Sequence, residues 1–239
     1  AMVGGLETFG ATLREKVRFA AQSDVQARAH RAPAPDLPLK TAAAPEGALI
    51  AIGPSTGGVE AIRQVLSSIP ADCPPIVIAQ HMPKGFTARF AARLNELVPL
   101  RVIEAADRMV LERGTAYVAP GDFHLRVEKT SGQLKCRVTQ DEQTSGHRPS
   151  VDVLFTSVAR VVGPMAVGAI LTGMGRDGAQ GMKAMREAGA FTIGQSKGSA
   201  LIYGMPKAAF ELGAVIEEGP VEKIAGRLVA ALMKLKAAA

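Results

Sequence analysis

From residue 48 onward, short apolar runs alternate with longer stretches in which apolar residues recur at helical spacing. The short runs predict strands at residues 48–53, 76–80, 100–104, 115–119, 166–172, 190–194 and 214–217. The longer stretches predict helices at residues 57–68, 86–97, 150–162, 178–188, 205–212 and 221–235. Because runs such as 76–79 and 166–171 are apolar throughout, their strands should be buried on both faces. The pattern therefore predicts an α/β fold, with a doubly wound, mainly parallel sheet covered by helices on both faces.

One region follows a different pattern. Residues 124–130 and 133–139 alternate apolar and polar side chains, and Ser131-Gly132 lies between the two segments. Alternation on both sides of a turn sequence predicts an antiparallel hairpin with one solvated face. We expect this hairpin at one edge of the sheet.

The first part of the chain has no room for a second core. Residues 7–22 carry apolar positions at helical spacing, and residues 31–45 are rich in proline and alanine. Such a composition is typical of an extended, semi-rigid linker. We therefore divide the chain into residues 1–46, a tail and linker that suggest a further part upstream, and residues 47–239, a single domain.

Composition and charge narrow the class of protein. The chain has 239 residues, of which 47% are hydrophobic and 4% aromatic, with no tryptophan, so its core must be aliphatic. Few aromatic residues argue against a platform for stacking nucleic-acid bases. The net charge is +6, but the basic residues are scattered and form no nucleic-acid stripe. The charge fits an ordinary surface or attraction to an acidic partner.

The cysteines and the lengths of the apolar runs indicate in which cellular compartment the protein is expected. Cys73 and Cys136 have no partners at metal-ligand spacing, and two cysteines do not make a disulfide scaffold. No apolar run reaches the roughly 18 residues of a membrane span, and no signal peptide opens the chain. We therefore expect reduced thiols, a cytoplasmic protein and no membrane insertion.

A serine stands at the tip of a predicted strand–turn–helix junction. The strand at 48–53 runs into Gly53-Pro-Ser-Thr-Gly57, which reads G-x-S-x-G and carries Ser55 at its centre. This is the nucleophile-elbow pattern of many serine hydrolases. Open α/β sheets place their sites at the carboxyl ends of strands, where this serine lies. The turn matches neither a Walker loop nor G-x-G-x-x-G.

Two other predicted strands supply the partners that a nucleophilic serine needs. One is followed by His81, and another leads into a glycine-rich turn containing Asp177. An imidazole can remove the serine proton, and a carboxylate on the other ring nitrogen fixes its tautomer. Glycine-rich turns at 53–58 and 173–178 could supply N–H donors for an oxyanion. The carboxyl edge of the sheet could thus gather a Ser55–His81–Asp177 triad.

Each candidate also has a structural interpretation. Ser55 and Thr56 could be N-cap residues of the helix that follows them. His81 could be a surface residue, and Asp177 with Gln180 reads as a capping box for the helix at 178–188. His147 could contact substrate or be an ordinary loop residue. No cluster has zinc-ligand spacing, so the sequence predicts no metal site and no cofactor.

Six motifs in order carry a family resemblance over roughly residues 47–235. They are Gly53-Pro-Ser-Thr-Gly-Gly58, Gln80-His-Met-Pro83 with Phe86-Thr87, Ala119-Pro-Gly121, His147-Arg-Pro-Ser-Val-Asp152, Leu171-Thr-Gly-Met-Gly175 with Asp177-Gly178, and Gly204-Met-Pro206. Together they resemble the catalytic domain of bacterial chemotaxis protein-glutamate methylesterases. One departure is Ser196-Lys197, where the family commonly has an acidic pair.

The resemblance implies an enzyme that demethylates glutamate methyl esters, and deamidates glutamines, on the cytoplasmic helices of chemoreceptors. It implies Ser55 as nucleophile, His81 as base and Asp177 as orienting acid, with no cofactor. The backbone N–H of Met174, with that of Thr56, would hold the oxyanion. The order Ser…His…Asp differs from that of α/β-hydrolases, so the elbow-like motif does not predict their fold.

The family normally carries an N-terminal receiver domain that covers the active site until an aspartate in it is phosphorylated. By this resemblance, residues 1–46 are the tail of a receiver domain and the interdomain linker, and 47–239 are the catalytic domain. We expect the chain to act without phosphorylation.

Two other functions fit the residues. One is a serine hydrolase for a different ester or amide. The other is a non-catalytic module that holds an anion at the helix start after Gly58, which would need neither His81 nor Asp177.

Overall fold

The computed structural model describes residues 44–237. The helix expected at 7–22, and all but the last two residues of the linker expected at 31–45, lie outside the described residues. Their interpretation therefore stays a prediction.

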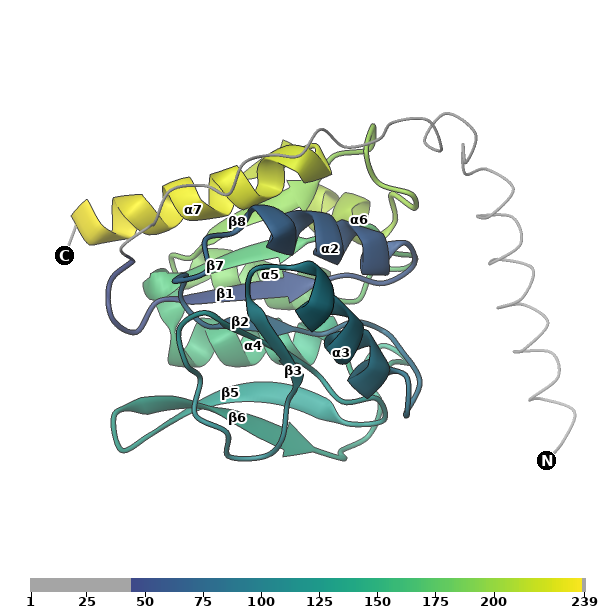
Figure 1. Ribbon diagram of the computed structural model, residues 1–239. Coiled ribbons are helices and arrows are strands. Elements are labelled where there is room, and N and C mark those ends of the chain that lie inside the picture. Colours follow the sequence, from purple (N-terminus) through teal and green to yellow (C-terminus); the bar gives the residue numbers. More distant parts are fainter. Residues whose placement is uncertain (1–43, 238–239) are drawn as a thin grey trace, which may run out of the picture. The chain divides into compact units, whose positions relative to one another are not determined.

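Seven parallel strands form the central sheet (Figure 1). They are β1 (Leu49–Gly53), β2 (Ile76–Ile78), β3 (Arg101–Glu104), β4 (Thr115–Val118), β7 (Ala166–Ile170), β8 (Phe191–Gln195) and β9 (Glu217–Gly219). Their order is β3-β4-β2-β1-β7-β8-β9, and every neighbouring pair is parallel. Strand β1 lies between β2 and β7, so the three strands that lead to the candidate residues are neighbours.

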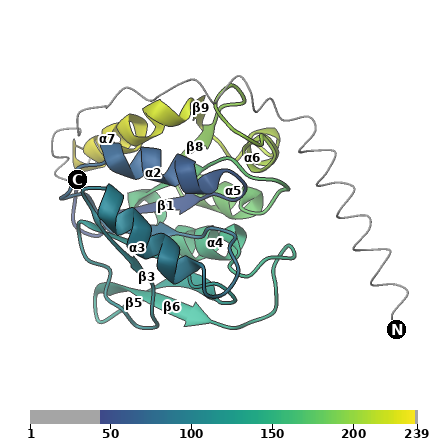
Figure 2. The same cartoon turned by 45° about the vertical axis from the view of Figure 1, so that its right-hand side comes forward.

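Helices cover both faces of the sheet, as the apolar strands predict (Figures 1 and 2). One face packs against α2 (Gly58–Ser68), α3 (Thr87–Leu97) and α7 (Val221–Ala237). The other packs against α4 (Val151–Val161), α5 (Ala179–Glu187) and α6 (Met205–Glu211), with the short 3-10 helix η1 (Gly163–Met165) after α4. In β1, Ile50 and Ile52 point to the first core, and Leu49 and Ala51 to the second. The predicted α/β fold is confirmed.

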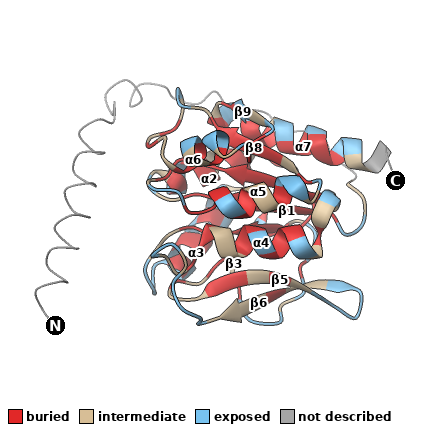
Figure 3. Cartoon of the chain, turned by 180° about the vertical axis from the view of Figure 1, so that it is seen from behind, coloured by how far each residue is buried: buried red, intermediate tan, exposed pale blue. Residues whose placement is uncertain are grey.

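The antiparallel hairpin is also confirmed, formed by β5 (His124–Thr130) and β6 (Gln133–Thr139). It makes a two-stranded sheet of its own, because β6 hydrogen-bonds to the connection at 108–111 and not to an edge strand. Its apolar side chains Leu125 and Val127 join the core that packs against α4. Figure 3 shows β5 next to α4, with buried residues along part of the strand. The hairpin therefore supports the helix whose start enters the site.

Most predicted elements begin and end within about two residues of the observed ones. The last strand differs: residues 214–217 were expected, whereas β9 spans Glu217–Gly219. Ala214 and Val215 are buried, but they pack into the core as the chain leaves α6, and ladder pairing with β8 starts only at Glu217. Within residues 44–237, no helix has the length and apolar character that crossing a membrane requires.

Candidate active site

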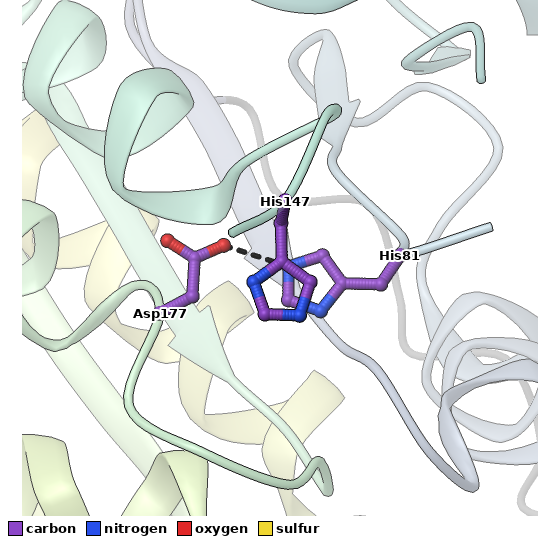
Figure 4. Close-up of side chains that lie close together, drawn as sticks. All are labelled: His81, His147 and Asp177. Atoms are coloured by element: carbon purple, nitrogen blue, oxygen red, sulfur yellow. Dashed lines mark hydrogen bonds and ion pairs between the residues drawn. The ribbon is translucent and has the colours of Figure 1, made fainter. Parts of the chain in front are cut away.

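Three turns at the carboxyl edge of the sheet bring Ser55, His81 and Asp177 together. Ser55 follows β1, His81 follows β2, and Asp177 lies between β7 and α5. The Oγ atom of Ser55 is 2.9 Å from Nδ1 of His81, and Nε2 of His81 is 2.6 Å from Oδ2 of Asp177. Figure 4 shows the His81–Asp177 contact. These distances form a continuous hydrogen-bonded chain from hydroxyl to carboxylate.

The histidine ring is held in one orientation. Its side chain is only 8% exposed, so the interpretation of His81 as a surface residue is wrong. In the serine-protease triad Nε2 faces the serine, whereas here Nδ1 does. With Nε2–H donating to Asp177, the lone pair of Nδ1 points to the Ser55 hydroxyl. Either ring nitrogen can act as base when the other carries the proton, so the reversed ring supports the same chemistry.

The turn that carries Ser55 is set by glycine and by the neighbouring strand. Gly57 has a φ of 80° and is the N-cap of α2, with no side-chain cap. The interpretation of Ser55 and Thr56 as capping residues is therefore wrong. The Ser55 N–H donates to the Thr172 carbonyl, and the Thr172 hydroxyl donates to the Thr56 carbonyl. These bonds fasten the turn to the end of β7 and leave the serine hydroxyl directed at His81.

Gln80 joins the two turns that carry the serine and the histidine. It is 3% exposed, and its amide nitrogen donates to the carbonyls of Ser55 and His81 at 3.0 and 3.1 Å. Sequence reasoning assigned this residue no individual role. The one available signal was a glutamine at the end of an otherwise apolar, buried strand.

The carboxylate of Asp177 is bound by the start of a helix distant in sequence. Its Oδ2 accepts from the Val151 N–H at 2.7 Å, and its Oδ1 accepts from the Ser150 hydroxyl at 2.8 Å and the Asp152 N–H at 3.1 Å. The expected capping box with Gln180 is wrong, because Gly178 caps α5 without a side-chain bond. The acid serves the amino terminus of α4, where N–H groups and the helix dipole favour a negative charge.

These contacts keep Asp177 ionised. Burial by itself would raise its pKa, but the hydrogen bond and charge of His81 oppose it, together with the donors from Val151 and Ser150. The net result is a pKa below the usual aspartate value. An ionised, fully bonded carboxylate is suited to orient the imidazole and to stabilise its protonated form.

Both expected oxyanion donors lie in turns beside Ser55. Thr56 follows it directly, and Met174 follows Gly173, which is so close that an added Cβ would lie 2.7 Å from Cβ of Ser55. Gly204 lets the next loop approach this turn, since a Cβ there would lie 2.7 Å from the Gly173 carbonyl. The roles of Met174 and Thr56 remain predictions.

His147 stacks on the candidate base. The ring centroids of His147 and His81 are 3.8 Å apart, with an interplanar angle of 9° (Figure 4). With Asp177 they place three possible metal-ligand atoms within 4.8 Å. However, imidazole binds metals in its ring plane at about 2.0–2.1 Å, and a metal in one of two stacked planes lies outside the other. The arrangement fits a ring that covers His81 and does not fit a metal site.

The cysteines offer no competing nucleophile. Cys73 and Cys136 are buried and unpaired with each other. Burial raises the pKa of both thiols to about 12, so both are protonated at neutral pH.

Comparisons with known proteins agree on one family. Residues 50–228 match the family model described as CheB methylesterase. A "protein-glutamate methylesterase/protein-glutamine glutaminase 1" of Caulobacter vibrioides is 54% identical over 201 residues, covering 84% of this chain and 58% of that protein. A "protein-glutamate methylesterase/protein-glutamine glutaminase 2" of Pseudomonas aeruginosa is 43% identical over 225 residues, covering 94% and 64%. The chain thus spans about three-fifths of these relatives.

A solved structure matches most of the chain. The CheB methylesterase catalytic domain of Thermotoga maritima superposes with a TM-score of 0.76 at 34% sequence identity. The match covers 78% of this chain and 99% of that one.

Proposed function

Because the chain belongs to the CheB methylesterase family, we propose that it hydrolyses methyl esters of glutamate side chains on chemoreceptors and deamidates glutamines there. The observation that carries this proposal is the chain of hydrogen bonds from Ser55 through His81 to Asp177. A buried, ionised carboxylate and an oriented imidazole make a serine hydroxyl nucleophilic.

The first half of the reaction forms an acyl-enzyme. As Oγ of Ser55 attacks the ester carbonyl carbon, its proton passes to Nδ1 of His81, and Asp177 stabilises the imidazolium. The carbonyl oxygen becomes an oxyanion held by the N–H groups of Met174 and Thr56. When the tetrahedral intermediate collapses, the imidazolium gives its proton to the departing methanol.

The second half restores the serine. His81 removes a proton from a water molecule, the resulting hydroxide attacks the acyl carbon, and the bond to Oγ breaks. Oγ takes back the proton and the product is a glutamate carboxylate. With a glutamine substrate the departing group is ammonia. Every proton in this cycle moves through His81, so protonating His81 in acid removes the base.

The full-length setting is also part of the proposal. The substrates are the cytoplasmic helices of methylated chemoreceptors, and the enzyme acts in the cytoplasm without inserting into a membrane or binding nucleic acid. Residues 47–239 form the catalytic domain, and 1–46 are the tail of a receiver domain and its linker. The greater length of the relatives supports a further domain in the family's full-length proteins.

The two competing functions lack this support. A module that merely held an anion at the start of α2 would need neither His81 nor Asp177. It would therefore not explain the hydrogen bonds that connect both residues to Ser55. A hydrolase for another ester would share the triad, and only the substrate distinguishes it.

The substrate is tested with a methylated receptor cytoplasmic fragment, whose glutamates are followed by mass spectrometry. We expect methyl esters and receptor glutamines to become glutamates with the native chain. Ser55→Ala should lower the rate by at least about a thousandfold. The matched control is Ser67→Ala, because the Ser67 hydroxyl donates to the Arg63 carbonyl within its own helix and lies outside the three turns of the site. Methyl esters that survive the native chain would reject this substrate class.

A further inference from the structure

Asp152 lies beside the triad and takes no part in the mechanism above. It is in the first turn of α4, next to the residues that bind Asp177, and it is half-buried. Its N–H donates to Oδ1 of Asp177 at 3.1 Å, while its own Oδ1 accepts from the Gly181 N–H at 2.7 Å. One residue therefore contacts both the orienting acid and the helix that follows it.

The Gly181 contact ties α5 to α4 at close range. An added Cβ at Gly181 would lie 2.7 Å from both the Asp152 carbonyl oxygen and Cβ of Phe155. The backbones of the two helices are therefore so close here that no side chain fits between them. Asp177 stands two residues before α5 begins. The Asp152 carboxyl group holds the first turn of α5 in place. Because Asp177 lies just before that helix, this contact also restrains the position of the Asp177 carboxylate.

We propose that Asp152 is a positioning residue that fixes Asp177 and, when ionised, adds a second negative charge that strengthens proton uptake by His81. The inference rests on the proposed function, since it concerns how the same triad works.

The surroundings of Asp152 set the pH at which this charge appears. Burial, followed by the charge of Asp177 and a hydrogen bond shared with it, raises the pKa of Asp152 to about 6, against the N–H donors of Gly181 and Gly178. Asp177 is the titratable group in contact, and His81 lies beyond it. His124 of β5 accepts from the Ser150 N–H on the same helix start, and α5 contributes backbone N–H groups.

Two states of the site follow. Below about pH 6 the Asp152 carboxyl group is neutral and can donate its proton to Asp177, which weakens the field at His81. Above that pH the Asp152 carboxylate adds a second negative charge next to Asp177, on the side away from the imidazole, so the imidazolium formed during catalysis is better stabilised. Asn at this position would keep the acceptor for Gly181 and imitate the neutral state at every pH.

The test is the pH dependence of kcat/KM for methyl-ester hydrolysis in the native chain and Asp152→Asn. We expect the alkaline plateau to fall by about three- to tenfold, and the pH of half-maximal activity to move down by about half a unit. Asp72→Asn is the control for charge: it removes an exposed carboxylate before β2, at the opposite edge of the sheet, and should reproduce the native profile.

Each result decides the inference. A fall in the plateau without a shift would reduce Asp152 to a structural contact, and an unchanged profile would remove its role. A variant that does not fold would contradict the inference too, because Asn keeps the helix contact. Covalent labelling of Ser55 by an active-serine phosphonate separates the two claims. If the native chain is labelled but the Asp152→Asn profile does not change as expected, the triad is supported and only the role of Asp152 is rejected. If the native chain is not labelled, the triad and the role of Asp152 are both rejected.

Discussion

At the scale of single residues, the site is specified by hydrogen bonds that leave each group one orientation. The Asp177 carboxylate is bonded by His81, Val151, Ser150 and Asp152. Buried polar groups are costly unless they are paired, so this set of donors holds the acid in place. The consequence is an imidazole whose free nitrogen is directed at the serine.

Replacing Asp177 by asparagine tests the orienting role. The Asn side chain is neutral and has one acceptor oxygen, which the donors of α4 would engage, so its NH2 group would face Nε2 of His81 and donate to it. The imidazole would then be held in the tautomer that cannot accept the serine proton. We expect kcat to fall by about a thousand- to ten-thousandfold, as the corresponding change does in serine proteases. The measurement is methyl-ester hydrolysis with Asp72→Asn alongside, and a loss below tenfold would be incompatible with the triad.

Replacing Gln80 by alanine tests the link between the two turns. The carbonyls of Ser55 and His81 would lose a shared buried donor. We expect the free energy of unfolding to fall by about 1–3 kcal/mol, and kcat to fall with it. Urea denaturation of Gln80→Ala and of Gln133→Ala, an exposed position at the start of β6, provides the comparison. Equal midpoints for the two variants would refute the link.

At the scale of elements, hydrophobic periodicity located the helices and most strands, whereas features that depend on contacts between distant segments were missed, among them the position of β9. The strand at 76–80 and the helix at 150–162 are visible in the sequence because their apolar residues repeat with the right period. The local pattern at Asp177 and Gln180 predicted a capping box that does not form. The Asp177 carboxylate instead accepts from donors at the start of α4, some 25 residues earlier. Ser150 is the N-cap of α4, a position that serine favours, but nothing in the local sequence shows that its hydroxyl also donates to Asp177.

Close packing of α4 and α5 gives a prediction at this scale. Gly181→Ala would push a methyl group into the Asp152 carbonyl and Phe155. Because backbone cannot move aside cheaply, we expect a loss of about 1–3 kcal/mol in unfolding free energy and lower activity. Gly198→Ala is the matched control, since an added Cβ there meets nothing within 4 Å. Thermal melts of both variants measure the difference, and equal melting temperatures would disprove the close contact.

At the scale of the whole molecule, strand order explains why one edge of the sheet carries the site. Strands β2, β1 and β7 are neighbours, so turns at residues 55, 81 and 177 meet although they are far apart in sequence. The sequence predicted the three residues, because each stands at the end of a predicted strand or its turn. It could not predict the reversed imidazole or the stacking of His147, which depend on side-chain placement across separate segments.

The pH dependence of stability follows from the two neighbouring acids. Asp152 has a folded pKa of about 6, above its ordinary 3.8, so the native state binds this proton more tightly and stability is lost as pH rises through that window. Asp177 acts oppositely: its contribution is lost as pH falls through its lowered pKa.

Comparing the native chain with Asp152→Asn isolates the first effect, since Asp177 is common to both. We expect the variant to be more stable above about pH 6, by at most about 3 kcal/mol and by less where solvent screens the half-buried carboxylate, and the difference to vanish below about pH 4. Thermal melts across this range measure it. A variant that is less stable than the native chain at neutral pH would show that burying the ionised Asp152 carboxylate does not destabilise the fold.

The most direct test of the account is to map where an active-serine phosphonate binds covalently. The native chain should carry the label on Ser55, identified by mass spectrometry of its peptides. His81→Ala should abolish the labelling, because the hydroxyl then has no base. An unlabelled native chain, or a label on another residue, would contradict the claim that the Ser55–His81–Asp177 chain of hydrogen bonds is a catalytic triad.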